Sequence, residues 1–360
     1  MSIHFHPLAI KEVKKETADC VSVLFDVPEN LQEEFRFTQG QSLTMRATIN
    51  GGEVRRTYSI CSSPFDHQLK VAIKKVEGGL FSVFANDLLT HKDILEVMPP
   101  IGSFYTTLHA SNQKNYIAFA AGSGITPVLS IIKTTLATEP HSSFTLVYGN
   151  KSRSSIIFFE ELEGLKNKFI NRFNLIHILS REKTDANLNF GRINKEKCAH
   201  LFSKLLDVKA ADEFFICGPE EMIFAVKDFL ESKDVSEKKI HFELFTTPGQ
   251  NKKYEVRSTK HEEEGPHSNI TVKLDGKSFD FTIPLNSDES ILDAAMQQGA
   301  DVPYACKGGV CCTCKARLIE GEVKMDVHWG LEQEEIEQGF ILTCQSHPTT
   351  EKVVVDFDVK

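Results

Sequence analysis

Residues 306–314 read CKGGVCCTC, so four cysteines stand within nine positions, and a fifth thiol follows in the segment LTCQSH. The spacing of the candidate ligands is Cys306-x4-Cys311-x2-Cys314-x29-Cys344. Three thiolates on one short loop, with a fourth returned from a distant strand, is a ligand spacing of [2Fe–2S] clusters. Gly308 and Gly309 would let the backbone wrap closely around such a cluster and present N–H groups to its sulfur atoms. The loop therefore predicts an iron–sulfur site.

Cys312 falls between the ligand positions and is the thiol of this loop that the spacing leaves over. Four cysteines can also hold a tetrahedral zinc ion, which is the alternative for this loop. Structural zinc sites usually combine two short cysteine pairs, whereas here an x4-x2 loop is followed by a long gap. That difference favours the iron cluster.

The sequence around the loop, ILDAAMQQGADVPYACKGGVCCTCKARL, resembles a plant-type ferredoxin, and all four ligand positions match. The resemblance implies an α+β, β-grasp ferredoxin domain over residues 268–360. The local pattern agrees with it. ITVKL, a DG turn and SFDFTI predict a hairpin, SDESILDAAMQQG predicts a capped helix ended by Gly299, and KVVVDFD predicts a closing strand.

The composition of the 360-residue chain is that of a soluble globular protein with two or three domains, because 41% of its residues are hydrophobic and 25% are charged. The charge is uneven: residues 261–360 carry 19 acidic and 8 basic side chains, a net −11, and residues 1–260 carry +2. No basic stripe is visible, so nucleic-acid binding is not expected. The acidic part could meet basic surfaces on partners or serve only solubility.

The nine cysteines are an odd number in a chain without a recognisable secretory signal, which argues against a disulfide-built secreted protein. The most apolar stretch, YIAFAAGSGITPVLSII, is interrupted by Gly, Ser, Thr and Pro. It predicts a strand, a loop and a helix, and no membrane span. We therefore expect a cytoplasmic protein with reduced thiols.

Three patterns of apolar residues follow one another along the chain. Residues 1–110 show short alternating apolar runs such as CVSVLF and LKVAIKKV, separated by turn residues, which predicts a small antiparallel β-barrel. Residues 111–247 alternate buried-strand runs, among them YIAFAA, FTLVYG, FNLIHIL and EFFICG, with helical segments, which predicts a parallel α/β sheet. Residues 248–267 lack apolar periodicity and are expected to form a linker.

Residues 55–64, RRTYSICSSP, resemble the flavin signature Arg-x-Tyr-Ser of the ferredoxin–NADP reductase superfamily. The resemblance implies that Arg56 neutralises the flavin pyrophosphate and that Tyr58 lies against the isoalloxazine ring. It also implies that Ser59 bonds near the reactive nitrogen of the ring, with Thr57 in the same binding segment. Alone, such a strand could be plain sheet surface.

A second segment, EGGLFSVF at 77–84, predicts a helix whose first N–H groups face phosphate, with Gly78, Gly79 and Ser82 at its opening. The pyrophosphate of FAD needs two anchors, the arginine of the first motif and the helix start of the second. The two motifs together therefore favour an FAD-binding domain over an FMN site.

The segment AAGSGITPVLS at 120–130 contains Gly122 and Gly124 but no third glycine, so it departs from the usual dinucleotide fingerprint and could be an ordinary strand-to-helix turn. The same superfamily carries Gly-x-Gly-x-Thr-Pro at this place. The resemblance implies that Thr126 approaches the nicotinamide.

The segment CGPEEM resembles the second nicotinamide motif of the superfamily. This implies that Cys217 sits beside the carbon that gives up hydride, and that Gly218 and Pro219 shape the turn. An isolated buried thiol would more often be a core residue.

The segment HFELFTTPG resembles the terminal Glu-x-Phe of the superfamily and implies that Glu243 and Phe245 lie near the flavin, with core packing of Phe245 as the alternative. Glu243 and Cys217 join Tyr58 and Ser59 as the predicted catalytic set.

Basic and hydroxyl side chains follow two of the predicted strands, in GNKSRSS and LSRE. They are Lys151, Ser152, Arg153, Ser180 and Arg181. Such groups suit the 2′-phosphate of NADPH, whereas an NAD site more often shows an acid. Each of them could also be a solvated surface residue. The sequence favours NADPH, with NADH possible.

The resemblance covers almost the whole chain and implies an NAD(P)H-dependent electron-transfer reductase. A nicotinamide delivers two electrons as hydride and a [2Fe–2S] cluster takes one, so FAD stands between them. The domain order and the cysteine segments look most like the reductase components of ring 1,2-phenylacetyl-CoA epoxidase, which implies a separate di-iron oxygenase as partner and a role in phenylacetate degradation. Reductases of steroid hydroxylases or acyl-lipid desaturases, a general diaphorase or redox sensor, and a zinc-containing regulatory protein are the alternatives.

Overall fold

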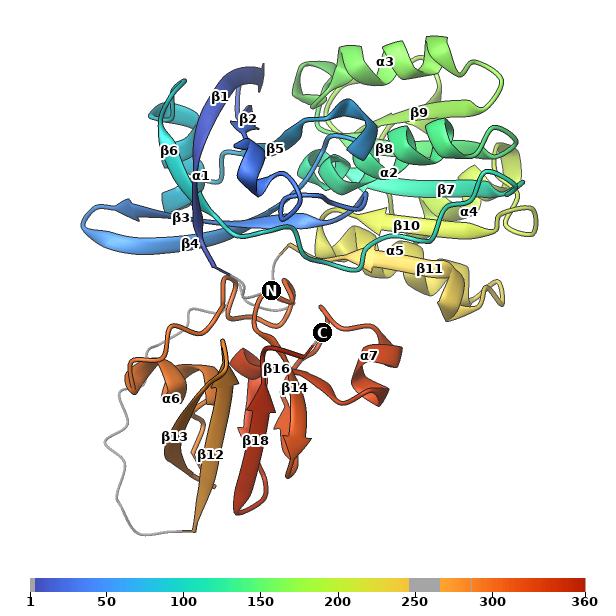
Figure 1. Ribbon diagram of the computed structural model, residues 1–360. Coiled ribbons are helices and arrows are strands. Elements are labelled where there is room, and N and C mark those ends of the chain that lie inside the picture. The colour runs from blue at the N-terminus through green and yellow to red at the C-terminus, as the bar shows by residue number, and fades with distance from the viewer. Residues whose placement is uncertain (1–3, 246–265, 286, 360) are drawn as a thin grey trace.

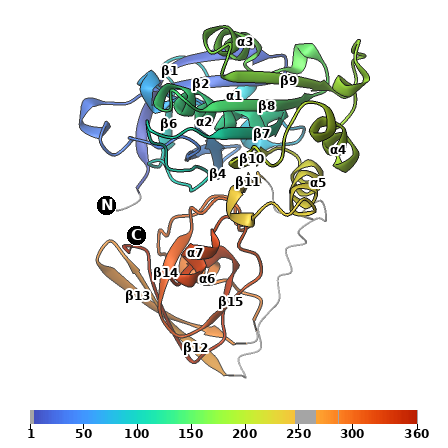
Figure 2. The same cartoon turned by 90° about the vertical axis from the view of Figure 1, so that its right-hand side faces the viewer.

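The structure is a computed structural model that describes residues 4–245, 266–285 and 287–359. These residues form a six-stranded sheet, two five-stranded sheets and one two-stranded ribbon. The six-stranded sheet and the first five-stranded sheet lie side by side, and the C-terminal part packs against the junction between them (Figure 1; Figure 2). The expected linker at 248–267 lies outside the described residues up to residue 265.

The first sheet is antiparallel, with strand order β4-β3-β6-β1-β2-β5. Its strands are β1 (His6–Thr17), β2 (Cys20–Asp26), β3 (Ser42–Ile49), β4 (Gly52–Ser59), β5 (Leu69–Lys74) and β6 (Ile94–Val97). An antiparallel bridge between Ile60 and Val71 joins the two ends of this order, so the sheet curves round on itself as a barrel does. Phe81 and Ala85 of helix α1 (Leu80–Asp87) complete its apolar core.

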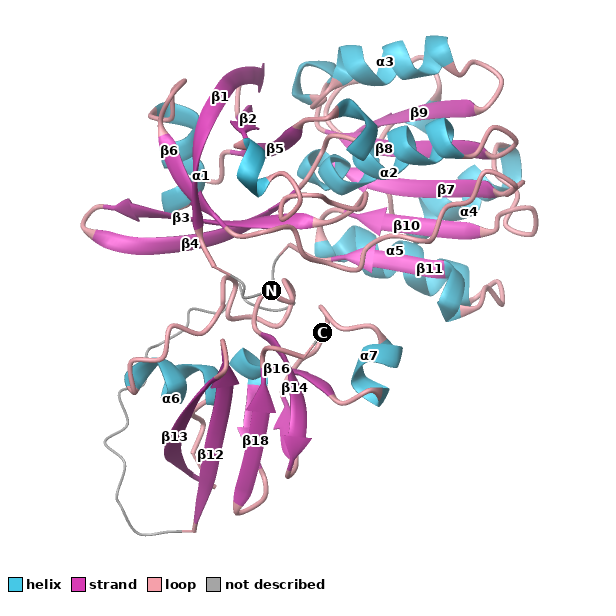
Figure 3. Cartoon of the chain, in the orientation of Figure 1, coloured by secondary structure: helices cyan, strands magenta, loops and turns pink. Residues whose placement is uncertain are grey.

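The second sheet is parallel throughout, with order β11-β10-β7-β8-β9. Its strands are β7 (Asn115–Ala121), β8 (Ser143–Asn150), β9 (Phe173–Leu179), β10 (Glu213–Cys217) and β11 (Ile240–Glu243). Helices α2 (Ile125–Thr138) and α3 (Phe159–Lys168) share a core with one face, and α4 (Lys195–Lys204) and α5 (Glu220–Glu231) with the other (Figure 3). The strand order reverses between β7 and β10, and such switch points are where open α/β sheets bind ligands.

The third sheet is mixed, with order β13-β12-β18-β14-β16. Its strands are β12 (His267–Leu274), β13 (Lys277–Pro284), β14 (Lys315–Glu320), β16 (Phe340–Leu342) and β18 (Lys352–Asp356). The remaining elements are α6 (Ile291–Gln297), α7 (Gln333–Glu337) and a ribbon of β15 (Val323–Met325) with β17 (Ser346–Pro348). The predicted hairpin turns at Asp275 and Gly276, both of which have positive φ, and Ser290 caps the predicted helix through the N–H of Asp293.

The predicted fold classes, an antiparallel barrel, a parallel α/β sheet and a C-terminal α+β domain, agree with these sheets and helices. Short 3-10 turns connect their elements. They are η1 (Glu29–Leu31), η2 (Pro64–Asp66), η3 (Gly122–Gly124), η4 (Arg153–Ser155), η5 (Asn187–Asn189), η6 (Glu237–Lys239) and η7 (Thr343–Gln345). Within the described ranges, every helix is too short or too polar to cross a bilayer.

Candidate functional site

A cleft of about 1120 Å³ lies between the barrel and the carboxyl ends of the parallel strands. Most of the predicted nucleotide ligands line it. They are Arg56, Thr57, Tyr58, Ser59, Gly79, Ser82, Gly122, Thr126, Lys151, Ser180, Arg181, Gly218, Pro219 and Phe245. Motifs from the barrel and from the parallel sheet, far apart in the sequence, thus surround one cavity.

Six predicted residues are not on the lining: Gly78, Gly124, Ser152, Arg153, Cys217 and Glu243. Arg153 has another partner, because its guanidinium lies 4.7 Å from the centre of the Phe159 ring. Gly124 acts through the backbone. A Cβ at this position would stand 2.0 Å from the carbonyl oxygen of Cys217, so only glycine lets η3 approach the end of β10 this closely.

The barrel side of the cleft offers an aromatic ring beside a cation. The Tyr58 ring packs against Phe81 with 5.6 Å between centres, and burial raises the pKa of Tyr58 well above its usual value. Its phenol is therefore neutral at physiological pH. Exposed Arg56 donates a hydrogen bond of 2.7 Å to the backbone carbonyl of Arg55, which orients the guanidinium at the rim. A flat ring and a planar cation fit an isoalloxazine and a pyrophosphate, respectively.

The turn before α1 is shaped by Ser82, whose hydroxyl accepts a hydrogen bond from the N–H of Val76 and donates one to the carbonyl of Gly79. A Cβ at Gly79 would lie 2.6 Å from that hydroxyl oxygen, so the turn requires glycine. Gly79 is the N-cap of α1, and the positive end of a helix favours phosphate. This wall therefore fits the second anchor of a pyrophosphate.

Three predicted catalytic groups meet where the barrel touches the parallel sheet. The Ser59 hydroxyl donates a hydrogen bond of 2.8 Å to a carboxylate oxygen of Glu243, and Glu243 is the register partner of Cys217. Burial raises the pKa of Glu243 to about 7, against the smaller opposing effect of the Ser59 hydrogen bond. Burial, and then the Glu243 charge, raise the pKa of the Cys217 thiol. The thiol stays neutral, whereas the carboxyl can take or release a proton near neutral pH.

The far end of the cleft is cationic. The N–H of Ser180 bonds the carbonyl of Asn150, and the N–H of Arg181 bonds that of Lys151, so the parallel ladder continues beyond β8 and β9. Lys151 and Arg181 are both exposed there. This pair of charges suits a phosphate group.

Sequence reasoning missed several residues that also line the cleft, including Lys74, Lys75, Arg192 and Asn194. Lys74 and Lys75 end or follow β5, directly before the predicted glycine turn. Arg192 stands in the segment GRIN after η5, and its guanidinium forms a 3.6 Å ion pair with Glu221. The lysine pair at a strand end could have indicated Lys74 and Lys75. The segment GRIN offered no comparable signal for Arg192 and Asn194.

The cysteine loop brings all four predicted ligands together. No three His, Cys, Asp or Glu side chains within residues 4–245, 266–285 and 287–359 converge as a single ion would require. Instead the thiols lie in two pairs, because the largest influence on the pKa of each is its neighbour, Cys306 with Cys311 and Cys314 with Cys344. Two pairs fit the two irons of a [2Fe–2S] cluster better than they fit one tetrahedral zinc ion.

The backbone of the loop also suits a cluster. The N–H of Gly308 bonds the Cys306 sulfur at 3.3 Å, and the N–H of Cys306 bonds the Cys311 sulfur at 3.5 Å. Donors of this kind stabilise thiolate and sulfide charge. Cys312 turns elsewhere, because its thiol donates to the carbonyl of Gly330.

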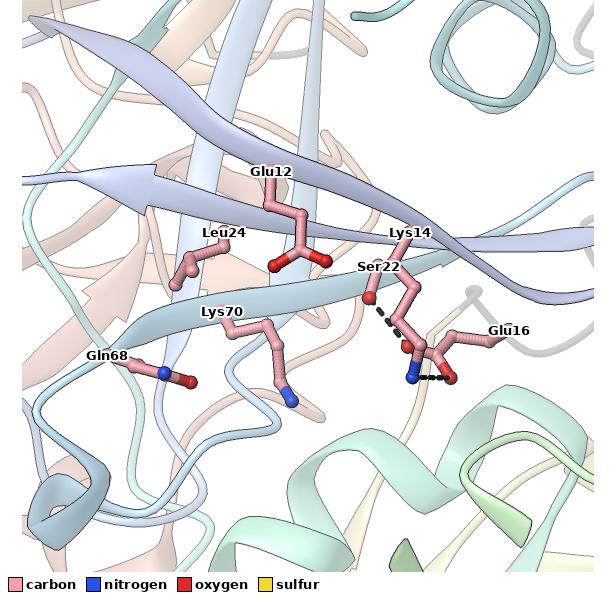
Figure 4. Close-up of a pocket in the computed structure, with 7 residues that line it drawn as sticks. All are labelled: Glu12, Lys14, Glu16, Ser22, Leu24, Gln68 and Lys70. Atoms are coloured by element: carbon pink, nitrogen blue, oxygen red, sulfur yellow. Dashed lines mark hydrogen bonds and ion pairs between the residues drawn. The ribbon is translucent and has the colours of Figure 1, made fainter. Parts of the chain in front are cut away.

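A second, smaller hollow of about 80 Å³ lies on the outer face of β1, β2 and β5 (Figure 4). It carries two acidic and two basic side chains, and three of these four pair with neighbours. Glu16 accepts hydrogen bonds from Ser22 and Lys14, and Lys70 lies 3.6 Å from Glu161. The hollow therefore balances its own charges and does not resemble a ligand site.

Comparison with known proteins finds three family models along the chain. Residues 7–105 match the oxidoreductase FAD-binding domain, 119–228 the oxidoreductase NAD-binding domain and 272–349 the 2Fe-2S iron-sulfur cluster binding domain. One component protein of the 1,2-phenylacetyl-CoA epoxidase from Escherichia coli (strain K12) is 46% identical over 357 residues, which are 99% of this chain and 98% of that protein. This chain belongs to the family of oxygenase reductase components.

Other relatives of the reductase support the assignment. The ferredoxin reductase component of 3-ketosteroid-9-alpha-monooxygenase from Rhodococcus rhodochrous is 32% identical over 97% of this chain and 96% of its own length. The fold of phthalate dioxygenase reductase is similar, with a TM-score of 0.58, 24% identity and 98% of each chain covered. The reductase is an oxidoreductase with FAD, NAD and 2Fe-2S domains, and its relatives are components of oxygenase systems.

Proposed function

We propose that the protein carries electrons from NADPH through FAD and a [2Fe–2S] cluster to a di-iron oxygenase of the phenylacetyl-CoA epoxidase type. The 46% identity over the whole chain to the epoxidase component from Escherichia coli carries the proposal. When bound, the FAD accepts a hydride from the nicotinamide and supplies its two electrons one at a time to the cluster. The reductase would work in the cytoplasm.

The residues of the chain have three tasks in this scheme. Arg56, Thr57, Gly78, Gly79 and Ser82 would hold the FAD pyrophosphate, with Phe245 beside the ring. Gly122, Gly124 and Thr126, with the turn Cys217–Pro219, would place the nicotinamide against the flavin. The four loop cysteines would hold the cluster. The corresponding domains would span 1–110, 111–247 and 268–360, joined by the linker 248–267.

Tyr58 and Ser59 would border the flavin ring, where the proton chemistry of the reaction takes place. The Ser59 hydroxyl is bonded to Glu243, whose pKa of about 7 lets it hold a proton at the ring and pass it to solvent. The neutral Cys217 thiol would pack against the nicotinamide without charge. Excluding water and holding this geometry are the contribution of the protein.

Selectivity for NADPH would come from Lys151 and Arg181 at the cationic end of the cleft, assisted by Ser152, Arg153 and Ser180. Arg192, on the same lining, would add a third cation. A 2′-phosphate offers these groups a charged partner that NADH lacks. Arg153 should contribute less than Arg181, because its guanidinium is stacked on Phe159.

The test is NADPH consumption with the purified oxygenase components of a phenylacetyl-CoA epoxidase, with and without phenylacetyl-CoA, while the epoxide product is quantified. We expect epoxide to form in proportion to the NADPH consumed, and only when this reductase is present. Rapid dye reduction without product would refute the partner and leave the NADPH–FAD–cluster chain intact. A steroid oxygenase, the partner type of the Rhodococcus relative, would then be assayed in the same way.

A further inference from the structure

The strand that lines the cleft also contacts the cluster loop. Neighbouring side chains of a strand point to opposite faces, so Arg55 and Thr57 share one face of β4 and Arg56 points to the other. Arg56 and Thr57 both border the cleft, whereas Arg55 does not. The Thr57 hydroxyl lies 3.1 Å from that of Thr44 on β3, and the Thr44 hydroxyl lies 3.0 Å from that of Thr313. Thr313 directly precedes the ligand position Cys314. Two hydrogen bonds therefore connect the cleft wall to the cluster loop.

Arg55 is the centre of this contact. It is only 7% exposed, and its guanidinium lies 4.1 Å from the centre of the Tyr304 ring and 3.4 Å from Asp301. Its Nε also donates a 2.7 Å hydrogen bond to Glu53, which fixes the side chain on the barrel. A buried arginine stacked on an aromatic ring of another domain is a strong and directional contact.

A second contact clamps the far side of the cluster loop to the parallel sheet. The Trp329 ring lies edge-on to Phe224 of α5 and to Phe242 of β11, at 5.7 and 6.3 Å between centres. Val310, inside the cysteine loop, packs against the same apolar core. Trp329 remains 40% exposed, so the two phenylalanines cover only part of its ring.

The ionic contacts across the junction share one polarity. Arg55 pairs with Asp301 and Lys238 with Glu334, so in both ion pairs the cation belongs to residues 1–260 and the anion to the acidic C-terminal part. The His4 ring also lies 3.2 Å from a carboxylate oxygen of Asp275. At these contacts the described residues of the C-terminal part are therefore electrostatically complementary to the surface that they meet.

We propose that the outer face of β3 and β4, centred on Arg55 and Thr44 and completed by Phe224 and Phe242, is the docking surface that holds residues 301–313 and Trp329 while electrons cross from flavin to cluster. This rests on the proposed electron path. Each crossing would move one electron from the reduced flavin to the cluster, which would pass that electron to the oxygenase before it accepts the next. After two crossings the hydride would have become two electrons in the oxygenase and one proton released to solvent.

Trp329 is the single tryptophan of the chain and reports docking directly. The experiment compares holoprotein of the wild type, Arg55→Ala and Arg46→Ala by acrylamide quenching of tryptophan fluorescence. Arg46 is a matched control. It is the cross-strand partner of Arg55, also lies over the Phe5 ring and also bonds Glu53, but its closest ionic partner is Glu96 of the barrel, and the charge of Asp301 affects its pKa least.

Arg55→Ala should raise the quenching constant and shift emission to the red, with the docked-to-undocked ratio falling about tenfold, because contacts of this kind are worth about one power of ten in an equilibrium. In anaerobic stopped-flow with NADPH, flavin bleaching should keep its wild-type rate and cluster bleaching should slow by up to a similar factor. Arg46→Ala should match the wild type in both measurements.

Wild-type quenching and wild-type cluster reduction in Arg55→Ala would overturn the docking surface. If that variant does not fold, Asp301→Asn, at a position 80% exposed, and Thr44→Val carry the same test from the two sides of the contact. A wild-type protein whose flavin is never reduced by NADPH, or whose cluster never follows, would instead refute the proposed function.

Discussion

Replacing Glu243 by glutamine should stabilise the protein above neutral pH and leave its stability unchanged near pH 4. The pKa of this carboxyl is raised from 4.5 to about 7, so the native state binds the proton more tightly than the unfolded chain does. Between those two values the native state holds more protons, and stability falls as the pH rises. Ionisation of this half-buried carboxylate should therefore cost up to about 3 kcal/mol once the pH exceeds 7.

Glutamine has the shape of glutamate, and its amide oxygen can still accept the hydrogen bond from Ser59. The assay is urea unfolding of the holoprotein at pH 5 and pH 8, followed by far-UV circular dichroism. The advantage of Glu243→Gln should grow toward about 3 kcal/mol between these conditions.

Glu213 on the neighbouring strand supplies a control of opposite sign. Burial raises the pKa of Glu213, but hydrogen bonds from His241 and Lys114 outweigh it and hold the pKa below its usual value. Its ionised form therefore stabilises the fold above pH 4.5, and Glu213→Gln should destabilise the protein at pH 8. A Glu243→Gln protein no more stable than wild type at pH 8 would refute the assignment of a half-buried, proton-holding carboxyl.

Three further outcomes are expected. Cys311→Ser should abolish the visible and EPR signals of the cluster while NADPH-dependent ferricyanide reduction persists. Cys312→Ser should retain the cluster signals and the ferricyanide reduction. Loss of the cluster signals in Cys312→Ser would contradict the ligand assignment. Arg181→Ala should raise the Michaelis constant for NADPH by about tenfold and leave that for NADH within about twofold, as for loss of one charged contact to phosphate; equal effects on both would exclude a 2′-phosphate role. Gly124→Ala should lower the free energy of unfolding by about 3 kcal/mol, since its Cβ would collide with the Cys217 carbonyl, and an unchanged melting temperature would show that the turn can relax.

The features predictable from the sequence are those that depend on neighbouring residues. Three motifs each impose a local backbone shape: the cysteine loop, the Arg-x-Tyr-Ser strand and the glycine turn before α1. Their sequences could therefore be interpreted without a structure. Strands β7 to β10 of the parallel sheet were predictable for the same reason, through continuous apolar runs. The motifs meet around one cleft because the strand order of the parallel sheet reverses between β7 and β10.

The features that escaped prediction depend on side-chain direction and on contacts between distant segments. Arg153 and Arg181 look equivalent as basic residues after strands, yet η4 turns Arg153 onto Phe159 while Arg181 lines the cleft. Arg55 stood beside the predicted FAD ligand and gave no sign that its partner lies 246 residues away. Periodicity indicates a face, but it does not indicate what packs against that face.

The two-faced strand β4 limits how freely the C-terminal domain can be exchanged between reductases. Adjacent residues of this strand serve different domains, so a one-residue insertion would turn Arg55 toward the cleft and Arg56 toward the cluster loop. A chimera that receives a foreign ferredoxin domain should therefore need Thr44 and Arg55 exchanged along with it. If evolution exchanged the ferredoxin domain, the barrel residues that contact it would have to change as well. Substitutions on the two sides of the junction should therefore occur together.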